Sequence, residues 1–178
     1  MAEIKSAIEL AMEKTTGFRL SREEKEKLKD EEVHAKAQGL VHRFLEVDLH
    51  FREVEKELAQ YDPEEKSRLK KLVIQFLIQA ILLDKENDLA FQGIERFKPG
   101  SSRVIDKMRA LTNDYQKRRN EEYEKVKGDL RTQLERQGIS GSAVLPRVEG
   151  RPEWEGLLAL LKAPFERELQ GLMDELNR

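Results

Sequence analysis

Three histidines lie eight residues apart, at positions 34, 42 and 50 of this 178-residue chain. Glu31 and His34 have the Glu-x-x-His spacing that places a carboxylate and an imidazole on one face of a helix, as in the di-iron sites of helical bundles. Such a site takes two of these pairs from two helices, whereas no other predicted helix of this chain contains a histidine. Steps of eight residues also turn about 80° around a helix, so the three imidazoles do not share a face. We therefore expect no metal site and interpret these charges as solvated pairs one helical turn apart.

The segment 138–142 reads Gly-Ile-Ser-Gly-Ser and approaches the Gly-x-Ser-x-Gly pattern of a hydrolase nucleophile elbow. Ser142 occupies the position of the second glycine, and no strand–helix pattern surrounds the segment. The Gly-x-x-Gly within it also lacks the Lys-Ser/Thr of a phosphate-binding loop. We interpret the segment as a linker and predict neither catalytic residues nor a cofactor, so the expected protein is not an enzyme.

The overall charge of the chain argues against a nucleic-acid partner. The formal net charge is -2 and the pI is near 6.1, which provides no basic field to attract phosphate groups. The basic run Lys117–Arg119 is followed by Glu121 and Glu122, and no aromatic residues interleave with it to stack bases. The absence of cysteine rules out disulfides and thiolate-bound zinc. It is compatible with a reducing cytoplasm, where we expect the protein to be.

Two apolar segments bear on membrane binding. Residues 2–16 predict a short amphipathic helix, but its polar face mixes acidic and basic residues, whereas membrane-surface helices have a Lys/Arg-rich face. We favour a packing helix, with a peripheral membrane coiled-coil protein as the alternative. The segment Leu72–Leu83 is shorter than the roughly 20 residues that span a bilayer, and Gln75 and Gln79 interrupt it. The N-terminus also lacks the basic and apolar regions of a secretory signal.

Two consecutive segments carry apolar residues at alternating steps of four and three, which is the seam of a coiled coil or helical bundle. Ser21 with Glu24 forms a capping box before the first seam, and Asp62-Pro63 marks a stop and a new helix start. Gly39 is the weakest position of the first seam, and the sequence leaves open whether the helix is continuous through it. The first seam consists of Val33, Ala37, Leu40, Phe44, Val47, Phe51, Val54, Leu58 and Tyr61, and the second of Leu69, Val73, Phe76, Ala80, Leu83, Asn87, Ala90, Ile94 and Phe97.

Folding the two seams back on each other at residues 62–63 predicts a long antiparallel helical hairpin. In this register the numbers of facing residues sum to about 124, so that Ala80 meets Phe44, a small residue opposite a large one. Asn87 then faces Ala37. Because a buried polar residue on a seam is known to fix helix register, we predict Asn87 as a register residue.

The second seam helix carries apolar residues beyond its seam, and a contact between two helices cannot cover them all. A third helix of the chain or a second copy must cover the remainder. We predict these residues as an interaction surface for a protein partner or for a homo-oligomer. They are Leu72, Leu77, Ile78, Ile81 and Leu82.

The rest of the chain predicts two more helices and a connector. A helix over residues 103–137 has a seam that thins in its middle, and Gly138 ends it. Residues 138–152, which contain several Gly, Ser and Pro, predict an extended connector packed on the bundle or a short β-strand. A last helix follows, and Pro164 should kink or split it. We divide the chain into residues 1–137 and 138–178, with the second part packed on the same bundle.

These patterns together predict an all-α protein, a long antiparallel helical hairpin extended to a three- to four-helix bundle or coiled coil. A short N-terminal helix precedes the hairpin, and a non-helical connector precedes the last helix. Because no reactive constellation is present, we expect a non-enzymatic helical protein that serves as a protein-interaction scaffold, an adaptor or a small chaperone-like module. A ferritin-like metal-binding enzyme and a peripheral membrane coiled-coil protein are the alternatives.

Overall fold

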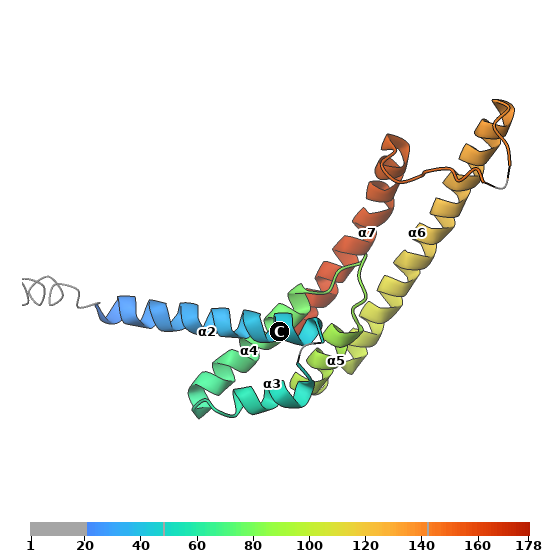
Figure 1. The fold of residues 1–178 in the computed structure, drawn as a ribbon. Helices are drawn as coiled ribbons and strands as arrows, with labels where there is room; N and C mark the ends of the chain where they lie inside the picture. Colours follow the sequence, from blue (N-terminus) through green and yellow to red (C-terminus); the bar gives the residue numbers. More distant parts are fainter. Residues whose placement is uncertain (1–20, 48, 142) are drawn as a thin grey trace, which may run out of the picture.

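The computed structural model describes residues 21–47, 49–141 and 143–178. Six helices and no strand occur in these residues, which confirms the prediction of an all-α protein (Figure 1). The predicted helix over residues 2–16 lies outside them. The helices are α2 (Arg22–Leu45), α3 (Phe51–Leu58), α4 (Pro63–Gln79), α5 (Asp88–Phe97), α6 (Ser102–Arg136) and α7 (Pro152–Asn177).

The helices form two parts, which we call the body and the arm. The body consists of α2 to α5, and the arm consists of α6 and α7, which lie side by side and project from the body (Figure 1). Ring contacts of Tyr115 with Phe165 and of Tyr123 with Trp154 show that α6 and α7 are antiparallel. Because α6 has 35 residues, it is about 52 Å long. The described part of the chain is therefore elongated.

Most helix ends lie where the capping and turn residues of the sequence predicted them. Both halves of the Ser21 capping box are present, which starts α2. The Asp62 carboxylate accepts two backbone N–H bonds, at 2.9 and 3.1 Å, and Pro63 is the first residue of α4. Gly138, with a φ of 77°, follows the end of α6. The predicted split at Pro164 does not occur, because α7 runs through that residue as one helix.

The first predicted seam does not form one helix. α2 ends at Leu45, and Val47 has a φ of 65°, a left-handed conformation that β-branched residues rarely adopt. The chain then begins α3 at Phe51. α2 runs through Gly39 as one helix, and Val47 is 63% exposed rather than part of a seam. Spacing did not reveal the break, because Phe44 and Phe51 on either side of it both pack on the main core.

The second predicted seam is also interrupted. α4 ends at Gln79 and α5 begins at Asp88, with a loop between them. Asn87 lies at the end of this loop and is 7% exposed. Its side-chain amide accepts a hydrogen bond from the backbone N–H of Leu82 (3.0 Å) and donates to the carbonyls of Leu82 (2.8 Å) and Lys85 (3.0 Å). Asn87 therefore holds a loop together, and its predicted place on a continuous helical seam is wrong.

The break after α2 changes the direction in which α2 packs on α4. Asp30 of α2 pairs with Arg68 of α4, and the His34 ring of α2 lies edge-on to the Phe76 ring of α4, with ring centroids 4.8 Å apart. Residue numbers rise together along both helices, so α2 and α4 run in the same direction (Figure 1). The predicted antiparallel register is wrong because the chain reverses twice, after α2 and after α3, rather than once.

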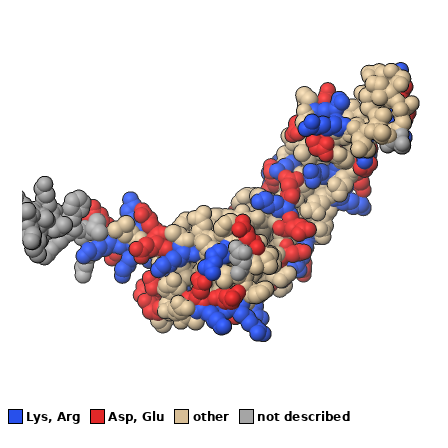
Figure 2. Space-filling view, in the orientation of Figure 1, with Lys and Arg blue, Asp and Glu red and all other residues tan. Residues whose placement is uncertain are grey.

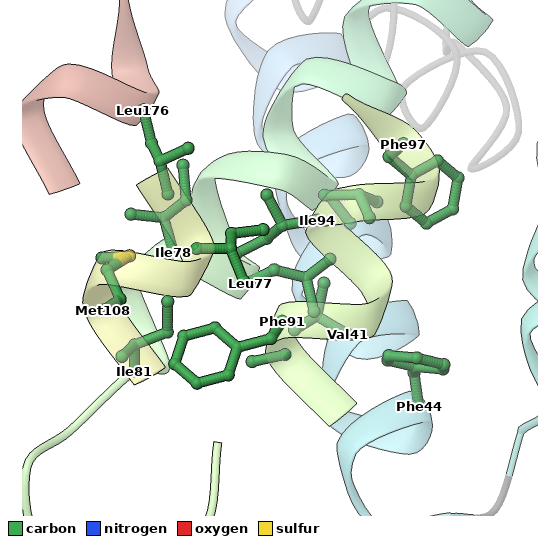
Figure 3. Close-up of a cluster of buried hydrophobic side chains, with 14 of the residues drawn as sticks. Val41, Phe44, Leu77, Ile78, Ile81, Phe91, Ile94, Phe97, Met108 and Leu176 are labelled. Atoms are coloured by element: carbon green, nitrogen blue, oxygen red, sulfur yellow. The ribbon is translucent and has the colours of Figure 1, made fainter. Parts of the chain in front are cut away.

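The main hydrophobic core lies where the body and the arm join (Figure 3). The helices α4 and α5 supply its centre, and α2 contributes Val41 and Phe44. Met108 of α6 and Leu176 of α7 add to it from the arm. A single chain therefore supplies the additional helices that the apolar surplus of residues 72–82 requires.

A second, smaller core holds the far end of the arm together. Trp154 of α7 is 3% exposed and packs with Leu130 of α6 and with Val148 of the connector. The Tyr123 ring lies edge-on to Trp154, with ring centroids 5.6 Å apart. The described connector residues form no strand, so the connector is an extended segment packed on the arm, which is one of the two predicted alternatives.

Two glycines in the body give opposite predictions for substitution by alanine. Gly39 is exposed, and an added Cβ would meet no atom within 4 Å, so Gly39→Ala should stabilise the protein by about 1 kcal/mol. A Cβ on Gly93 would lie 2.9 Å from Leu77 and 3.1 Å from Phe44, which are both buried. The overpacking should exceed the gain in helix propensity, so Gly93→Ala should destabilise by about 1 kcal/mol. Urea denaturation measures the change in the free energy of unfolding of each variant. A Gly93→Ala variant more stable than the unaltered chain would contradict the packing of α5 on α4.

Candidate functional site

The five residues predicted as an interaction surface differ in exposure. Leu77, Ile78 and Ile81 are at most 1% exposed and belong to the main core. Helices of the same chain bury these three side chains, so they do not form an exposed surface. Leu72 is partly buried against the core, and Leu82 is 46% exposed. Leu82 is thus the member of the predicted surface that is most open to a partner.

Leu82 lines a groove between α7 and the end of α4 with the loop that follows it. This α7 groove has a volume of about 690 Å³, within the range of sites that bind ligands. Its floor is apolar and includes Ile78, Ile81 and Leu169, which are all buried. Met173 of α7 also lines it and is partly buried. The groove is therefore a place where an apolar side chain from another molecule would leave water.

A charged cluster lies in the groove and ties the body to the arm. The loop residue Asp84 accepts a hydrogen bond from the Tyr115 hydroxyl at 2.7 Å and forms an ion pair with Lys162 at 2.8 Å. Lys162 also lies 3.4 Å from Glu166, one turn further along α7. Tyr115 is fully buried, whereas the side chains of Asp84 and Lys162 are 39% and 35% exposed. The loop, α6 and α7 therefore meet at one carboxylate.

The cluster keeps its groups in their ordinary charge states at neutral pH. Burial alone would raise the pKa of Asp84, but hydrogen bonds from Lys162 and Tyr115 outweigh it and lower that pKa. The hydrogen bond to Asp84 raises the pKa of Lys162. Burial, together with the bond to Asp84, raises the pKa of Tyr115. All three pKa values move away from neutrality, whereas a general acid or base works best with a pKa near the working pH.

The histidines considered for metal binding do not come together. The His34 ring packs against Phe76, and His42 Nδ1 lies 3.6 Å from Glu46 on the next turn. Among the residues that the structure describes, no three His, Asp or Glu side chains are placed to hold a metal ion. Within the same residues, no helix has the length and apolar character needed to cross a membrane.

Sequence reasoning missed the charged cluster, although two of its members carry a signal. The sequence places Tyr115 on a helix seam, and Lys162 stands alone in an apolar run from Gly156 to Phe165. A buried tyrosine hydroxyl needs a hydrogen-bond partner, and a lysine in an apolar run needs an acid. Neither signal identifies Asp84, because the Tyr115 contact spans 31 residues and depends on how the loop packs.

Comparison with known proteins adds no relative from which a function could be transferred. No protein-family model, curated protein or solved structure matches the chain. The class of protein is therefore defined by the structure, as an elongated all-α protein with an apolar groove beside its arm.

Proposed function

We propose that this chain is a non-enzymatic adaptor that binds an amphipathic helix of a protein partner in the α7 groove. The observation that supports the proposal is an apolar groove with an exposed leucine, Leu82, in its lining and a satisfied charged cluster beside it. Charged residues make up 38% of the chain, and the groove gathers six apolar side chains in one depression of its surface. Such depressions mark binding sites in soluble proteins.

The length and chemistry of the groove favour a helical occupant. Residues of α7 line it from position 162 to position 177, about 22 Å, which matches a helix of about 15 residues. Apolar anchors three and four residues apart on that helix would contact Leu82 and Met173, as in other helix-in-groove complexes. Asp84 and Lys162 already satisfy each other. An incoming helix would therefore bury apolar surface without leaving either charge unpaired.

Peptide selection on the full chain tests this proposal. A display library of amphipathic helical peptides is selected against the unaltered protein, and the enriched peptides are measured by fluorescence anisotropy. We expect these peptides to carry apolar anchors at helical spacing. Leu82→Glu should weaken their binding at least about tenfold, because it places an unpaired carboxylate against an apolar anchor. The matched control is Leu145→Glu, at a leucine that is 83% exposed and outside the groove, and it should leave binding unchanged.

The result for Leu82→Glu decides the proposal. If the selected peptides bind this variant as tightly as they bind the unaltered chain, they bind elsewhere and the proposal is wrong. If no peptide with apolar anchors is enriched, a helical occupant is wrong as well. Circular dichroism checks that the variant keeps its helix content, which we expect because Leu82 is 46% exposed.

A further inference from the structure

α7 has a second uncovered side, which does not contribute to the α7 groove. Leu160 is 80% exposed on this side. Glu153 and Arg167 lie seven residues before and after Leu160 and are also exposed, and a spacing of seven places all three on one side of a helix. Gly156 and Ala163, at the intervening positions, are exposed, and the space around Gly156 is open. We call these five residues the α7 outer face, and none of them lines the groove.

The α7 outer face is apolar at its centre and oppositely charged at its two ends. From Gly156 to Pro164 the only charged residue is Lys162, which pairs with Asp84 on the groove side at 2.8 Å. The acidic end and the basic end are equally far from Leu160. A surface with this arrangement is complementary to itself under a two-fold rotation about its centre.

We propose that the α7 outer face pairs with the same face of a second copy of this chain, in an antiparallel contact centred on Leu160. A two-fold axis at Leu160 places the two Leu160 side chains against each other. It also brings Glu153 of each copy opposite Arg167 of the other, because both lie seven residues from the axis. Gly156 and Ala163 carry little or no side chain, so the helix axes can approach to about 8–10 Å. This pairing goes beyond the groove function and does not depend on it.

The antiparallel orientation keeps the two bodies apart. Each body packs on α7 from Lys162 onward, through contacts such as Lys162 with Asp84 and Leu176 in the main core. α7 begins at the far end of the arm, so the two bodies lie toward opposite ends of the paired helices (Figure 1). Acidic and basic residues are mixed over the visible face of the arm (Figure 2), and the net charge of -2 gives only weak repulsion between copies.

The ion pairs give the contact its orientation, and the leucine pair supplies most of its burial. Exposed ion pairs contribute only about 0–1 kcal/mol each, so they select the antiparallel register rather than provide the affinity. A contact between two single helices is also smaller than the roughly 800 Å² per partner of a standard interface. We therefore expect a weak dimer whose population rises with protein concentration.

Light scattering coupled to size exclusion, over a range of concentrations of the full chain, tests the pairing. We expect the unaltered chain to form dimers and Leu160→Glu to abolish them, because two carboxylates would be buried against each other. Arg167→Glu should raise the dimer dissociation constant at least about tenfold, since it places like charges opposite each other twice. The double variant Glu153→Arg/Arg167→Glu exchanges both charges and should restore dimerisation. Leu145→Glu, at the exposed tip, is the matched control and should dimerise normally.

Disulfide trapping provides a second measurement that does not depend on a destabilising charge. The chain contains no cysteine, so Leu160→Cys introduces a single thiol at the proposed axis. Two thiols facing each other across that axis come within disulfide distance, and mild oxidation should yield a covalent dimer. Leu145→Cys should cross-link much more slowly.

Three results would overturn the pairing. The first is an unaltered chain that stays monomeric at every concentration, with no faster cross-linking of Leu160→Cys than of Leu145→Cys. The second is a dimer that persists in Leu160→Glu. The third is a double variant that dimerises no better than Arg167→Glu, which would exclude the antiparallel register. Circular dichroism of each variant should show unchanged helix content, because Glu153, Leu160 and Arg167 are all exposed.

Discussion

The Ile81→Ala variant should lose about 3 kcal/mol of its free energy of unfolding, whereas Leu82→Ala should change it by less than about 0.5 kcal/mol. The two residues are neighbours in the chain, but Ile81 is 0% exposed in the main core and Leu82 is 46% exposed. Truncating Ile81 removes buried methyl and methylene groups and leaves a cavity that the packed helices around it fill only partly. Truncating Leu82 removes atoms that are already largely in water.

Urea denaturation followed by far-UV circular dichroism measures the free energy of unfolding of both variants. If the slope of that free energy against urea concentration is unchanged, the variant has changed in stability and not in the compactness of its unfolded state. This pair separates two descriptions of the segment. If Ile81→Ala cost no more than Leu82→Ala, Ile81 in the loop after α4 would not be buried in the main core and would be free to contact a partner, as the sequence suggested. A large loss confined to Ile81→Ala would support the core described here.

The Tyr115→Phe variant should lose about 1.5 kcal/mol at neutral pH, because it removes the donor of a hydrogen bond to a charged carboxylate. The hydroxyl lies 2.7 Å from Asp84 Oδ1, and the ring itself is fully buried against Phe165. Phenylalanine retains that ring packing, so the loss reports on the hydroxyl. Asp84 keeps its ion pair with Lys162, and this limits the loss. Denaturation with urea at pH 7 measures the difference.

The stability difference between Tyr115→Phe and the unaltered chain should depend on pH at both ends of the range. Burial, followed by the bond to Asp84, raises the pKa of Tyr115 above its ordinary value of 10.0. Above pH 10, Tyr115 of the unfolded chain releases its proton while Tyr115 of the folded chain retains it. The contribution of Tyr115 to the free energy of unfolding therefore declines as pH rises. The pKa of Asp84 is lowered from 3.8 in the folded protein. The contribution of Asp84 to the free energy of unfolding is therefore present above pH 3.8 and declines as pH falls through the folded pKa. The difference between the two proteins should therefore narrow above pH 10 and below pH 3.8.

Tyr123→Phe is the matched control for Tyr115→Phe. The Tyr123 hydroxyl also donates to a carboxylate, that of Glu149 at 2.8 Å, but this hydrogen bond is exposed to solvent. Water replaces an exposed hydrogen bond readily, so the control should lose clearly less stability than Tyr115→Phe. Equal losses would show that the Asp84 cluster does not hold the loop to the arm.

Helix starts and stops were predictable because their signals are local. The Ser21 box, the Asp62 cap with Pro63, and the turn at Gly138 each lie within a few residues of the helix end that they define. Capping satisfies backbone N–H groups that the helix itself cannot pair, and the side chains that do this are recognisable in the sequence. These features therefore appear in the structure where the sequence indicated them.

The breaks within the two seams were not predictable from spacing. Phe44 and Phe51 keep helical spacing across the break after α2, and both pack on the main core. The loop after α4 likewise keeps Ile81 and Leu83 buried. A period of four and three shows which residues are apolar at regular intervals, but it does not show whether the backbone between them is helical. The break after α2 also reversed the predicted direction in which α2 packs on α4.

The sequence by itself determined the all-α class and the capped helix starts at Ser21 and Asp62. These follow from helical periodicity and from side chains that bond to nearby backbone. Only the tertiary structure decided the breaks around Val47 and before Asn87, the burial of Ile81, and the meeting of Tyr115 and Lys162 at Asp84. The burial of Ile81 and the Asp84 cluster depend on contacts between residues tens of positions apart, and the free energy of such contacts exists only once the helices have packed.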